Sequence, residues 1–231
     1  MSRSTLRIAL LLTPLALCFY VAAQVVARDR LAGKWTVHVS AGSSKASLQL
    51  TQTGHDGGSF EVPLQQLQGL PAGAIHNGAI RVEFQLVRDA GAFIFTGSLN
   101  KGSGSGEWIF KGNSAFTAEL HPYGYAQLTE EQLYQLALNS IDSLYIRELA
   151  RAGYRALPVN ELIALFSNNV RAEYIAGLAA AGYAKLSPGE LIALKSNGVD
   201  ATYIRSLQSR GYTNLSVHRI LSIRTSPGNQ Q

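Results

Sequence analysis

Residues 186–214 read LSPGELIALKSNGVDATYIRSLQSRGYTN, and this stretch decides the fold of the second half of the chain. Residues 157–185 carry the same amino acid at 15 of the 29 aligned positions, and a more divergent copy occupies 128–156. A fixed period of this kind indicates a repeat architecture, in which each unit buries its apolar face against its neighbours. A half repeat over 215–225 would close the series before a polar tail at 226–231.

Each copy carries the signals of two short helices. Thr129 with Gln132, and Ser187 with Glu190, have the spacing of a capping box, in which two side chains satisfy unpaired N–H groups at a helix start. The start of the second helix has a capping aspartate in two copies and an arginine in the other: Asp142, Asp200 and Arg171. We therefore expect a pair of helices in every unit.

A Gly-Tyr pair ends the second helix of every copy: Gly153-Tyr154, Gly182-Tyr183 and Gly211-Tyr212. Glycine adopts the left-handed conformation without strain, so each glycine is expected at the C′ position of a Schellman cap. Helices of about ten residues are unstable alone in water, so consecutive pairs must stack. The sequence predicts a short α-solenoid over 128–225, in which the tyrosines serve the architecture and not a stacking platform for nucleic acid or sugar.

Residues 33–119 alternate between apolar and polar side chains. The runs centre on Trp35, Leu48, Val62, Phe84 and Trp108. A period of two places one face of a strand on a core and the other in water. Turn residues separate the runs, so we expect six or so strands in a small antiparallel meander, closed or nearly closed as a barrel. The predicted fold class is α+β, with this β domain first and the helical repeats after it.

Within this domain, the segment Gly102-Ser-Gly-Ser-Gly106 has the composition of a phosphate-binding loop. A phosphate-binding loop needs Gly-Lys-Ser/Thr at the start of a helix, whereas strand-like residues flank this segment. We therefore expect a flexible hairpin turn here.

Residues 1–23 have the pattern of a secretory signal peptide. The positively charged segment 1–7 precedes the apolar segment 8–23, and small residues near its end allow cleavage before Gln24. An uncleaved anchor is the alternative, because residues 8–27 are about long enough to cross a bilayer. Either way, we expect an exported protein in the periplasm or another extracytoplasmic compartment.

We recognise no catalytic or metal-binding constellation in the sequence. The single cysteine, Cys18, lies in the apolar segment, so a cleaved chain would hold no thiol nucleophile and no disulfide. Glu130, Glu131 and Asp142 are typical of acids at helix starts. No two histidines have a metal-ligand spacing on one helix: His38, His55, His76, His121 and His218. We expect neither an enzyme nor a bound cofactor.

The layout resembles a two-part module of exported bacterial proteins, which also occurs as the extracytoplasmic tail of some membrane metallopeptidases of the β-lactam-receptor type. Two phrases carry the resemblance: Gly106-Glu-Trp-Ile-Phe-Lys-Gly-Asn113-Ser-Ala-Phe116 and the repeat from Leu186 to Ile204. The resemblance covers residues 33–225 and implies a small β domain followed by helical repeats. The sequence contains no His-Glu-x-x-His motif, so the resemblance implies no proteolytic activity.

Export, repeats and the lack of a catalytic set favour a non-enzymatic protein-interaction module, with an unidentified protein partner in envelope signalling or sensing. The alternative is an apolar small molecule bound inside the β domain. Gly33-Lys34-Trp35 is similar to the opening of lipocalin-type barrels, but this alternative needs a hollow interior, whereas Trp35 and Trp108 could fill a solid core. The net charge of +5 includes no run of five basic residues, so nucleic acid is not an expected partner. The membrane would be contacted only through an uncleaved N-terminal segment.

Overall fold

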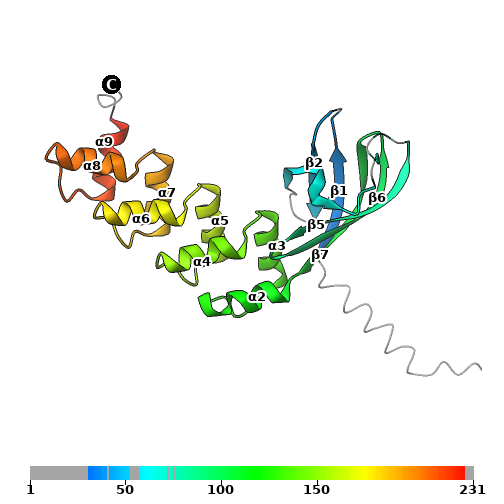
Figure 1. The fold of residues 1–231 in the computed structure, drawn as a ribbon, viewed down its shortest axis with the longest axis horizontal. Coiled ribbons are helices and arrows are strands. Elements are labelled where there is room, and N and C mark those ends of the chain that lie inside the picture. The colour runs from blue at the N-terminus through cyan, green and yellow to red at the C-terminus, as the bar shows by residue number, and fades with distance from the viewer. Residues whose placement is uncertain are drawn as a thin grey trace, which may run out of the picture.

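The computed structural model describes residues 31–226 except 41, 53–57, 72, 75 and 77. The expected α+β class is confirmed, because an antiparallel sheet comes first and helices follow (Figure 1). The sheet forms a rounded unit, and the helices extend from it as an elongated arm that ends near the C-terminus (Figure 1). The predicted signal segment and the last five residues lie outside the described part of the chain.

The sheet contains seven strands in the described residues: β1 (Ala32–His38), β2 (Lys45–Gln52), β3 (Ser59–Pro63), β4 (Leu67–Gln68), β5 (Ile80–Arg88), β6 (Gly91–Asn100) and β7 (Ser103–Gly112). Their order across the sheet is β3-β2-β1-β7-β6-β5-β4, and every neighbouring pair is antiparallel. The pairing of β7 with β1 brings the end of the meander back to its start, so the sheet curls.

The two edge strands, β3 and β4, are joined in the chain by a single 3-10 turn, η1 (Leu64–Gln66). Four Cα steps of at most about 3.6 Å separate Pro63 from Leu67, so these ends of the two edges lie within about 14 Å of each other. The curled sheet is therefore an incomplete barrel. Its two edges are connected by the chain itself rather than by a ladder of hydrogen bonds.

Alternation along the strands places the apolar side chains inside the sheet, as the sequence predicts. On β5, Val82, Phe84 and Leu86 are buried, whereas the residues between them are exposed. The register puts Phe84 opposite Phe95 on β6, and Phe95 opposite Trp108 on β7. One row of aromatic side chains thus crosses three strands on the inner face.

Eight α-helices follow in the described residues: α2 (Ser114–Leu120), α3 (Glu130–Leu138), α4 (Ser143–Arg151), α5 (Val159–Ser167), α6 (Ala172–Ala180), α7 (Pro188–Ser196), α8 (Ala201–Ser209) and α9 (Val217–Thr225). All but the last residue of helix α2 lies in the range 33–119 that we assigned to strands, so that part of the assignment is wrong. Asn113 caps this helix by accepting a hydrogen bond from the amide of Ala115 at 3.0 Å. Phe116 and Leu120, one helical turn apart, are its buried side chains.

The predicted capping signals form the expected contacts. Both capping boxes are complete, with Thr129 accepting from the amide of Gln132 at 3.2 Å and Ser187 accepting from the amide of Glu190 at 3.3 Å. The carboxylates of Asp142 and Asp200 each accept a backbone amide at 2.8 Å, whereas Arg171 makes no side-chain cap.

The three Gly-Tyr pairs form Schellman caps. Gly153, Gly182 and Gly211 have φ of 97°, 95° and 90°. The amide of the following tyrosine donates to the carbonyl of the leucine five residues before it in every case: Tyr154 to Leu149, Tyr183 to Leu178 and Tyr212 to Leu207. The helices stop where the sequence predicts because glycine alone adopts this conformation without strain.

Tyrosine hydroxyls connect each pair of helices to the next pair. The hydroxyl of Tyr145 donates to the carbonyl of Val170 at 3.0 Å, and that of Tyr174 donates to the carbonyl of Val199 at 2.7 Å. A second pair of such bonds joins a helix stop to the following unit: Tyr154 to Leu186 at 2.6 Å and Tyr183 to Leu215 at 2.8 Å. Burial raises the pKa of Tyr145 and of Tyr174 to about 12, so both phenols remain protonated hydrogen-bond donors even in moderately alkaline solution.

Candidate interaction surfaces

Two tryptophans fill the inside of the sheet in a reciprocal arrangement. Trp35 of β1 is 1% exposed, and its Nε1 donates to the carbonyl oxygens of Thr96 at 3.2 Å and Glu107 at 3.1 Å. Trp108 of β7 is equally buried, and its Nε1 donates to the carbonyl oxygen of Lys34 at 3.1 Å. Each indole N–H is thereby satisfied inside the core.

Aromatic rings occupy the space between the tryptophans. The ring centroids of Trp35 and Phe84 are 5.3 Å apart, those of Phe84 and Phe95 are 4.8 Å apart, and those of Phe93 and Trp108 are 6.0 Å apart. Centroid distances in this range correspond to direct ring contact. At these positions the interior that an apolar ligand would need is filled by the protein's own side chains.

The glycine-rich segment 102–106 corrects our expectation of a flexible hairpin turn. The turn consists only of Lys101 and Gly102, whose φ of 48° and 80° suit the type I′ turn of a tight hairpin. The rest of the segment belongs to strand β7 and pairs with β1 and β6.

The glycines of β6 and β7 allow a close approach that side chains would prevent. Gly97 and Gly106 lie opposite each other. A Cβ added to Gly106 would lie 2.0 Å from the carbonyl oxygen of Thr96, and one added to Gly97 would lie 2.8 Å from the ring of Trp35. These glycines are therefore needed for the close pairing of β6 and β7 in the curled sheet, and they leave room for the indole ring of Trp35.

A polar groove of about 690 Å³ lies on the outer face of β5, β6 and β7. Small hydroxyl side chains lie between longer charged ones along it: Thr96, Ser98 and Ser105 between Arg81, Glu83 and Glu107. The residues that line the groove include no histidine and no cysteine, so they form no His-activated or thiol nucleophile. The groove presents hydroxyl, carboxylate and guanidinium groups.

The described histidines do not come together. His38 is exposed, as its place in the alternating pattern predicts, and its Nδ1 lies 3.1 Å from the hydroxyl of Ser103. His76, His121 and His218 are also exposed, and His55 lies outside the described residues. Among the described residues, no three His, Cys, Asp or Glu side chains are grouped so that they could hold a metal ion.

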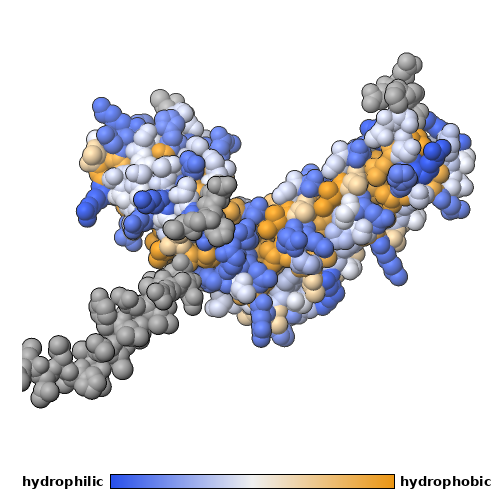
Figure 2. Space-filling view, turned by 180° about the vertical axis from the view of Figure 1, so that it is seen from behind, coloured by the Kyte–Doolittle hydropathy of each residue, from blue (hydrophilic) through white to orange (hydrophobic). Residues whose placement is uncertain are grey.

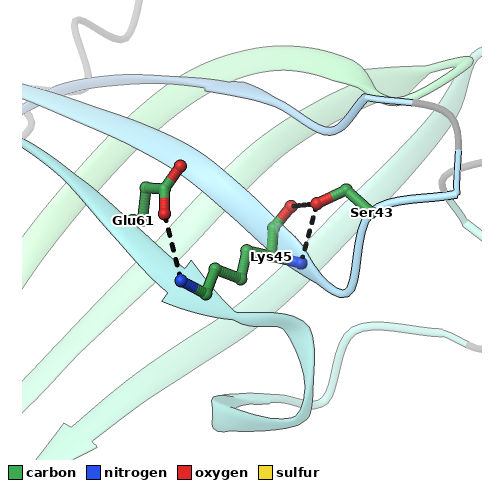
Figure 3. A network of polar contacts seen from close by, with 3 residues as sticks. All are labelled: Ser43, Lys45 and Glu61. Carbon is green, nitrogen blue, oxygen red and sulfur yellow. Dashed lines mark hydrogen bonds and ion pairs between the residues drawn. The ribbon is translucent and has the colours of Figure 1, made fainter.

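A polar network at the β2–β3 edge is a surface feature (Figure 3). Lys45 Nζ lies 3.3 Å from the carboxylate of Glu61, and the Ser43 hydroxyl bonds the backbone of Lys45. More than half of each charged side chain is exposed, so this pair contributes at most about 1 kcal/mol. The network pairs two strands and shows no feature of a binding site.

Tyr134 of α3 packs the start of the helical arm against the sheet. The ring of Tyr134 stacks on Trp108 at 5.6 Å with an interplanar angle of 7°, and it also contacts Phe93 and Phe110. Sequence reasoning missed this contact, because it joins residues of two domains that no local pattern relates.

Two carboxylates add polar contacts at the same junction. Glu130 Oε1 accepts the amide of Gly112 at 2.8 Å, and Asp89 Oδ2 accepts the amide of Ser143 at 3.1 Å. We had interpreted Glu130 only as an acid at a helix start. Its carboxylate also holds the last residue of β7, so the arm begins at a defined place on the sheet.

The position of Tyr134 recurs every 29 residues as Ile163, Ile192 and Leu221 on α5, α7 and α9. These three side chains are half-buried, whereas Tyr134 is buried. Residues one helical turn before them are half-buried as well. We call the resulting strip the apolar ledge: Val159, Ile163, Pro188, Ile192, Val217 and Leu221. Figure 2 shows hydrophobic surface along the arm.

The position three residues beyond the ledge carries a side chain that covers a tyrosine. On α5 this residue is Phe166, which packs edge-on against Tyr145 with the ring centroids 5.1 Å apart. The guanidinium carbon of Arg171 lies 4.3 Å from the centroid of the Phe166 ring and 4.9 Å from that of the Tyr145 ring. On α7 and α9, a cation lies directly over the ring: Lys195 over Tyr174 at 4.5 Å and Arg224 over Tyr203 at 4.9 Å. Arg171 thus packs on aromatic rings at the position where its counterparts cap a helix.

Comparisons with known proteins give no match: no protein family, no curated protein and no solved structure is similar to this chain at a significant level. The resemblance to the metallopeptidase tail module therefore depends on the two sequence phrases. None of the helices in the described residues is both long enough and apolar enough to cross a membrane.

Proposed function

We propose that this chain is a non-enzymatic, exported protein-interaction module, in which residues 128–225 form a short α-solenoid of 29-residue units. The observation that carries the proposal is the apolar ledge, a strip of half-buried side chains at equivalent positions of α5, α7 and α9. Apolar surface that continues over several neighbouring helices is typical of sites that bind other proteins.

The recurrence of contacts supports the solenoid. Helix α3 packs against α5, α5 against α7, and α7 against α9, while α4, α6 and α8 form a parallel series. The hydroxyl bonds of Tyr145 and Tyr174 repeat with the spacing of the sequence, since their acceptors Val170 and Val199 are also 29 residues apart. Each unit therefore makes its contacts with the neighbouring units.

The contacts of α3 indicate what the ledge accepts. At the first position of the series, aromatic side chains of the sheet cover Tyr134. The next three positions present Ile163, Ile192 and Leu221 to solvent in part. Apolar or aromatic side chains of a partner protein would pack favourably on these three residues, because the contact would remove apolar surface from water.

The described residues give less support to the alternative function, an apolar ligand bound inside the β domain, than to the protein-interaction proposal. Trp35, Phe93, Phe95 and Trp108 are almost fully buried and contact one another there. The groove of about 690 Å³ lies on the outer face and is lined mostly by polar residues. Export remains part of the proposal because residues 1–23 have the pattern of a secretory signal peptide. Export, the repeats and the lack of a recognised catalytic set together favour a partner in envelope signalling or sensing.

The ledge is tested by capture of partners from cell envelopes with the full-length protein. Ile163→Lys combined with Ile192→Lys is expected to reduce the captured partner about tenfold or more, because burying two ammonium groups in an apolar contact is costly. Ala179→Lys combined with Ala180→Lys on α6 is the matched control, since it adds the same two charges at exposed positions away from the ledge. Equal capture by the double variant and this control would show that the ledge is not the binding surface, provided that circular dichroism shows both to be folded.

A further inference from the structure

One end of the sheet's outer face is apolar. Five side chains on four neighbouring strands form what we call the entry patch: Ala32, Val87, Ala92, Ile94 and Ile109. Each lies beside the buried residues of its strand in the alternating pattern, so each points away from the core. The register makes the patch continuous, because Val87 pairs with Ala92, Ile94 pairs with Ile109, and Ile109 pairs with Ala32.

The entry patch is open to solvent. Val87 is 44% exposed, and Ala32 is exposed as well. Ile94 and Ile109 are half-buried, yet neither packs against the hydrophobic core of the described residues. Their contacts are therefore with neighbours on the outer face. Contiguous apolar surface of this kind marks a contact with a protein or with a membrane.

The rest of the outer face is polar. The row of the register next to the patch combines both signs of charge with a hydroxyl: Lys34, Glu83, Thr96 and Glu107. The row after it holds one arginine and three hydroxyls: Thr36, Arg81, Ser98 and Ser105. Successive rows are about 7 Å apart along the strands. An apolar phase could therefore contact the patch while the other rows stay in water.

The chain enters the sheet at this patch. Ala32 is the first residue of β1, and the carbonyl of Leu31 accepts the amide of Phe110 at 2.8 Å. Residues 24–30 connect this point to the apolar segment 8–23. Eight Cα steps from residue 23 to Leu31 span at most about 29 Å. If the apolar segment stays attached and crosses a bilayer, the patch is held within that distance of the membrane.

Basic side chains favour a bilayer with anionic headgroups as the occupant. Lys111 is exposed and pairs with Ala92 of the patch. A lysine in this position can lay its aliphatic stem on apolar surface and keep its ammonium group among the headgroups. The connecting segment adds Arg28 and Arg30 with a single acid, Asp29. Anionic lipids attract basic residues that are held close to the membrane surface.

We infer that the chain keeps its N-terminal segment as a membrane anchor and lays the entry patch on the bilayer surface. Val87, Ile94 and Ile109 lie in the interfacial region, and Lys111 lies at the anionic headgroups. The contact removes apolar surface from water, and the anchor supplies the proximity. The inference goes beyond the proposed function and does not depend on the apolar ledge.

The first test measures how close two positions of the outer face lie to lipid. Full-length protein with Cys18→Ser is reconstituted into vesicles of phosphatidylcholine and phosphatidylglycerol, and a fluorophore is attached at Val87→Cys or at Ser98→Cys. Both positions are exposed, and Ser98 lies about 20 Å along β6 from Ala92. Lipids with a nitroxide high on the acyl chain are expected to quench the label at position 87 at least threefold more than the label at 98. Equal quenching at the two positions would overturn the inference.

The second test changes the charge beside the patch. Lys111→Glu is expected to halve the quenching at Val87→Cys or reduce it further, because a carboxylate is repelled by anionic headgroups. Lys101→Glu is the matched control, since Lys101 is exposed in the turn at the opposite end of β6 and β7. An equal effect of the two substitutions contradicts the placement of Lys111 at the membrane.

The remaining outcomes are equally decisive. Full-length gene product recovered from cell membranes should have the intact mass of an uncleaved chain, and a mass that begins at Gln24 would overturn the inference. A label at position 87 that responds to protein concentration in detergent micelles, but not to nitroxide lipids, would identify a second copy as the occupant and overturn it as well. Ledge-dependent capture that persists in either case would leave the proposed function intact.

Discussion

Trp108→Ala is expected to lower the free energy of unfolding by about 3–5 kcal/mol, the range for truncating a large buried aromatic side chain. Trp108 is 1% exposed and contacts both Phe93 in the sheet and Tyr134 on α3. The substitution would leave a cavity at the point where the arm begins. The measurement is a denaturant titration followed by circular dichroism, with a loss below about 1.5 kcal/mol contradicting the assigned packing.

A double-mutant cycle adds a control for this contact. Trp108→Phe keeps a ring but removes the donor to the carbonyl of Lys34, so a smaller loss is expected. Because Trp108 and Tyr134 stack, the two alanine substitutions are expected to be non-additive by about 0.5–1.5 kcal/mol. Strict additivity would mean that the two rings do not meet and that the arm attaches elsewhere.

Gly106→Ala is expected to lower the free energy of unfolding by about 3 kcal/mol or more, because the new methyl group would clash with the backbone of the paired strand. Its Cβ would lie 2.0 Å from the carbonyl oxygen of Thr96 and 2.7 Å from the Cα of Gly97. Both are backbone atoms of the paired strand, so a rotamer change cannot relieve the clash. Strands β6 and β7 would have to move apart, which would also displace the indole of Trp35 from its carbonyl acceptors.

Gly189→Ala is the matched control for this substitution. Gly189 lies in the first turn of α7, and a Cβ added there meets nothing within 4 Å. The control is expected to leave stability unchanged or to raise it slightly, because alanine is the better helix former. A similar stability for both variants would show that the close approach of β6 and β7 is not present.

Local signals predicted much of this structure. Capping boxes, Gly-Tyr stops and alternating strands depend on residues that are near in sequence, and the observed contacts of Thr129, Ser187 and Gly182 follow from their chemistry. One turn of the chain, three residues after each helix-ending glycine, was not predictable from residue type. Ala156 and Lys185 adopt positive φ, of 53° and 59°, although neither residue favours that conformation.

The missed features depend on contacts between distant parts of the chain. Gly106 looked like a turn residue because its composition suggests flexibility, yet it is in a strand that must approach Thr96 closely. Tyr134 looked like another helix residue, and only the sheet shows why it is aromatic.

An in-frame deletion of residues 157–185 tests most directly whether the arm is a stack of equivalent units. The deletion removes 29 residues and would bring Val199 to the position of Val170, where it can accept the hydroxyl of Tyr145. If each unit contacts only its neighbours, the shortened protein should remain folded, monodisperse and cooperatively unfolding, with helical signal reduced by about one unit. Loss of the cooperative transition in the deleted protein, with a full-length control that unfolds cooperatively, would contradict the account.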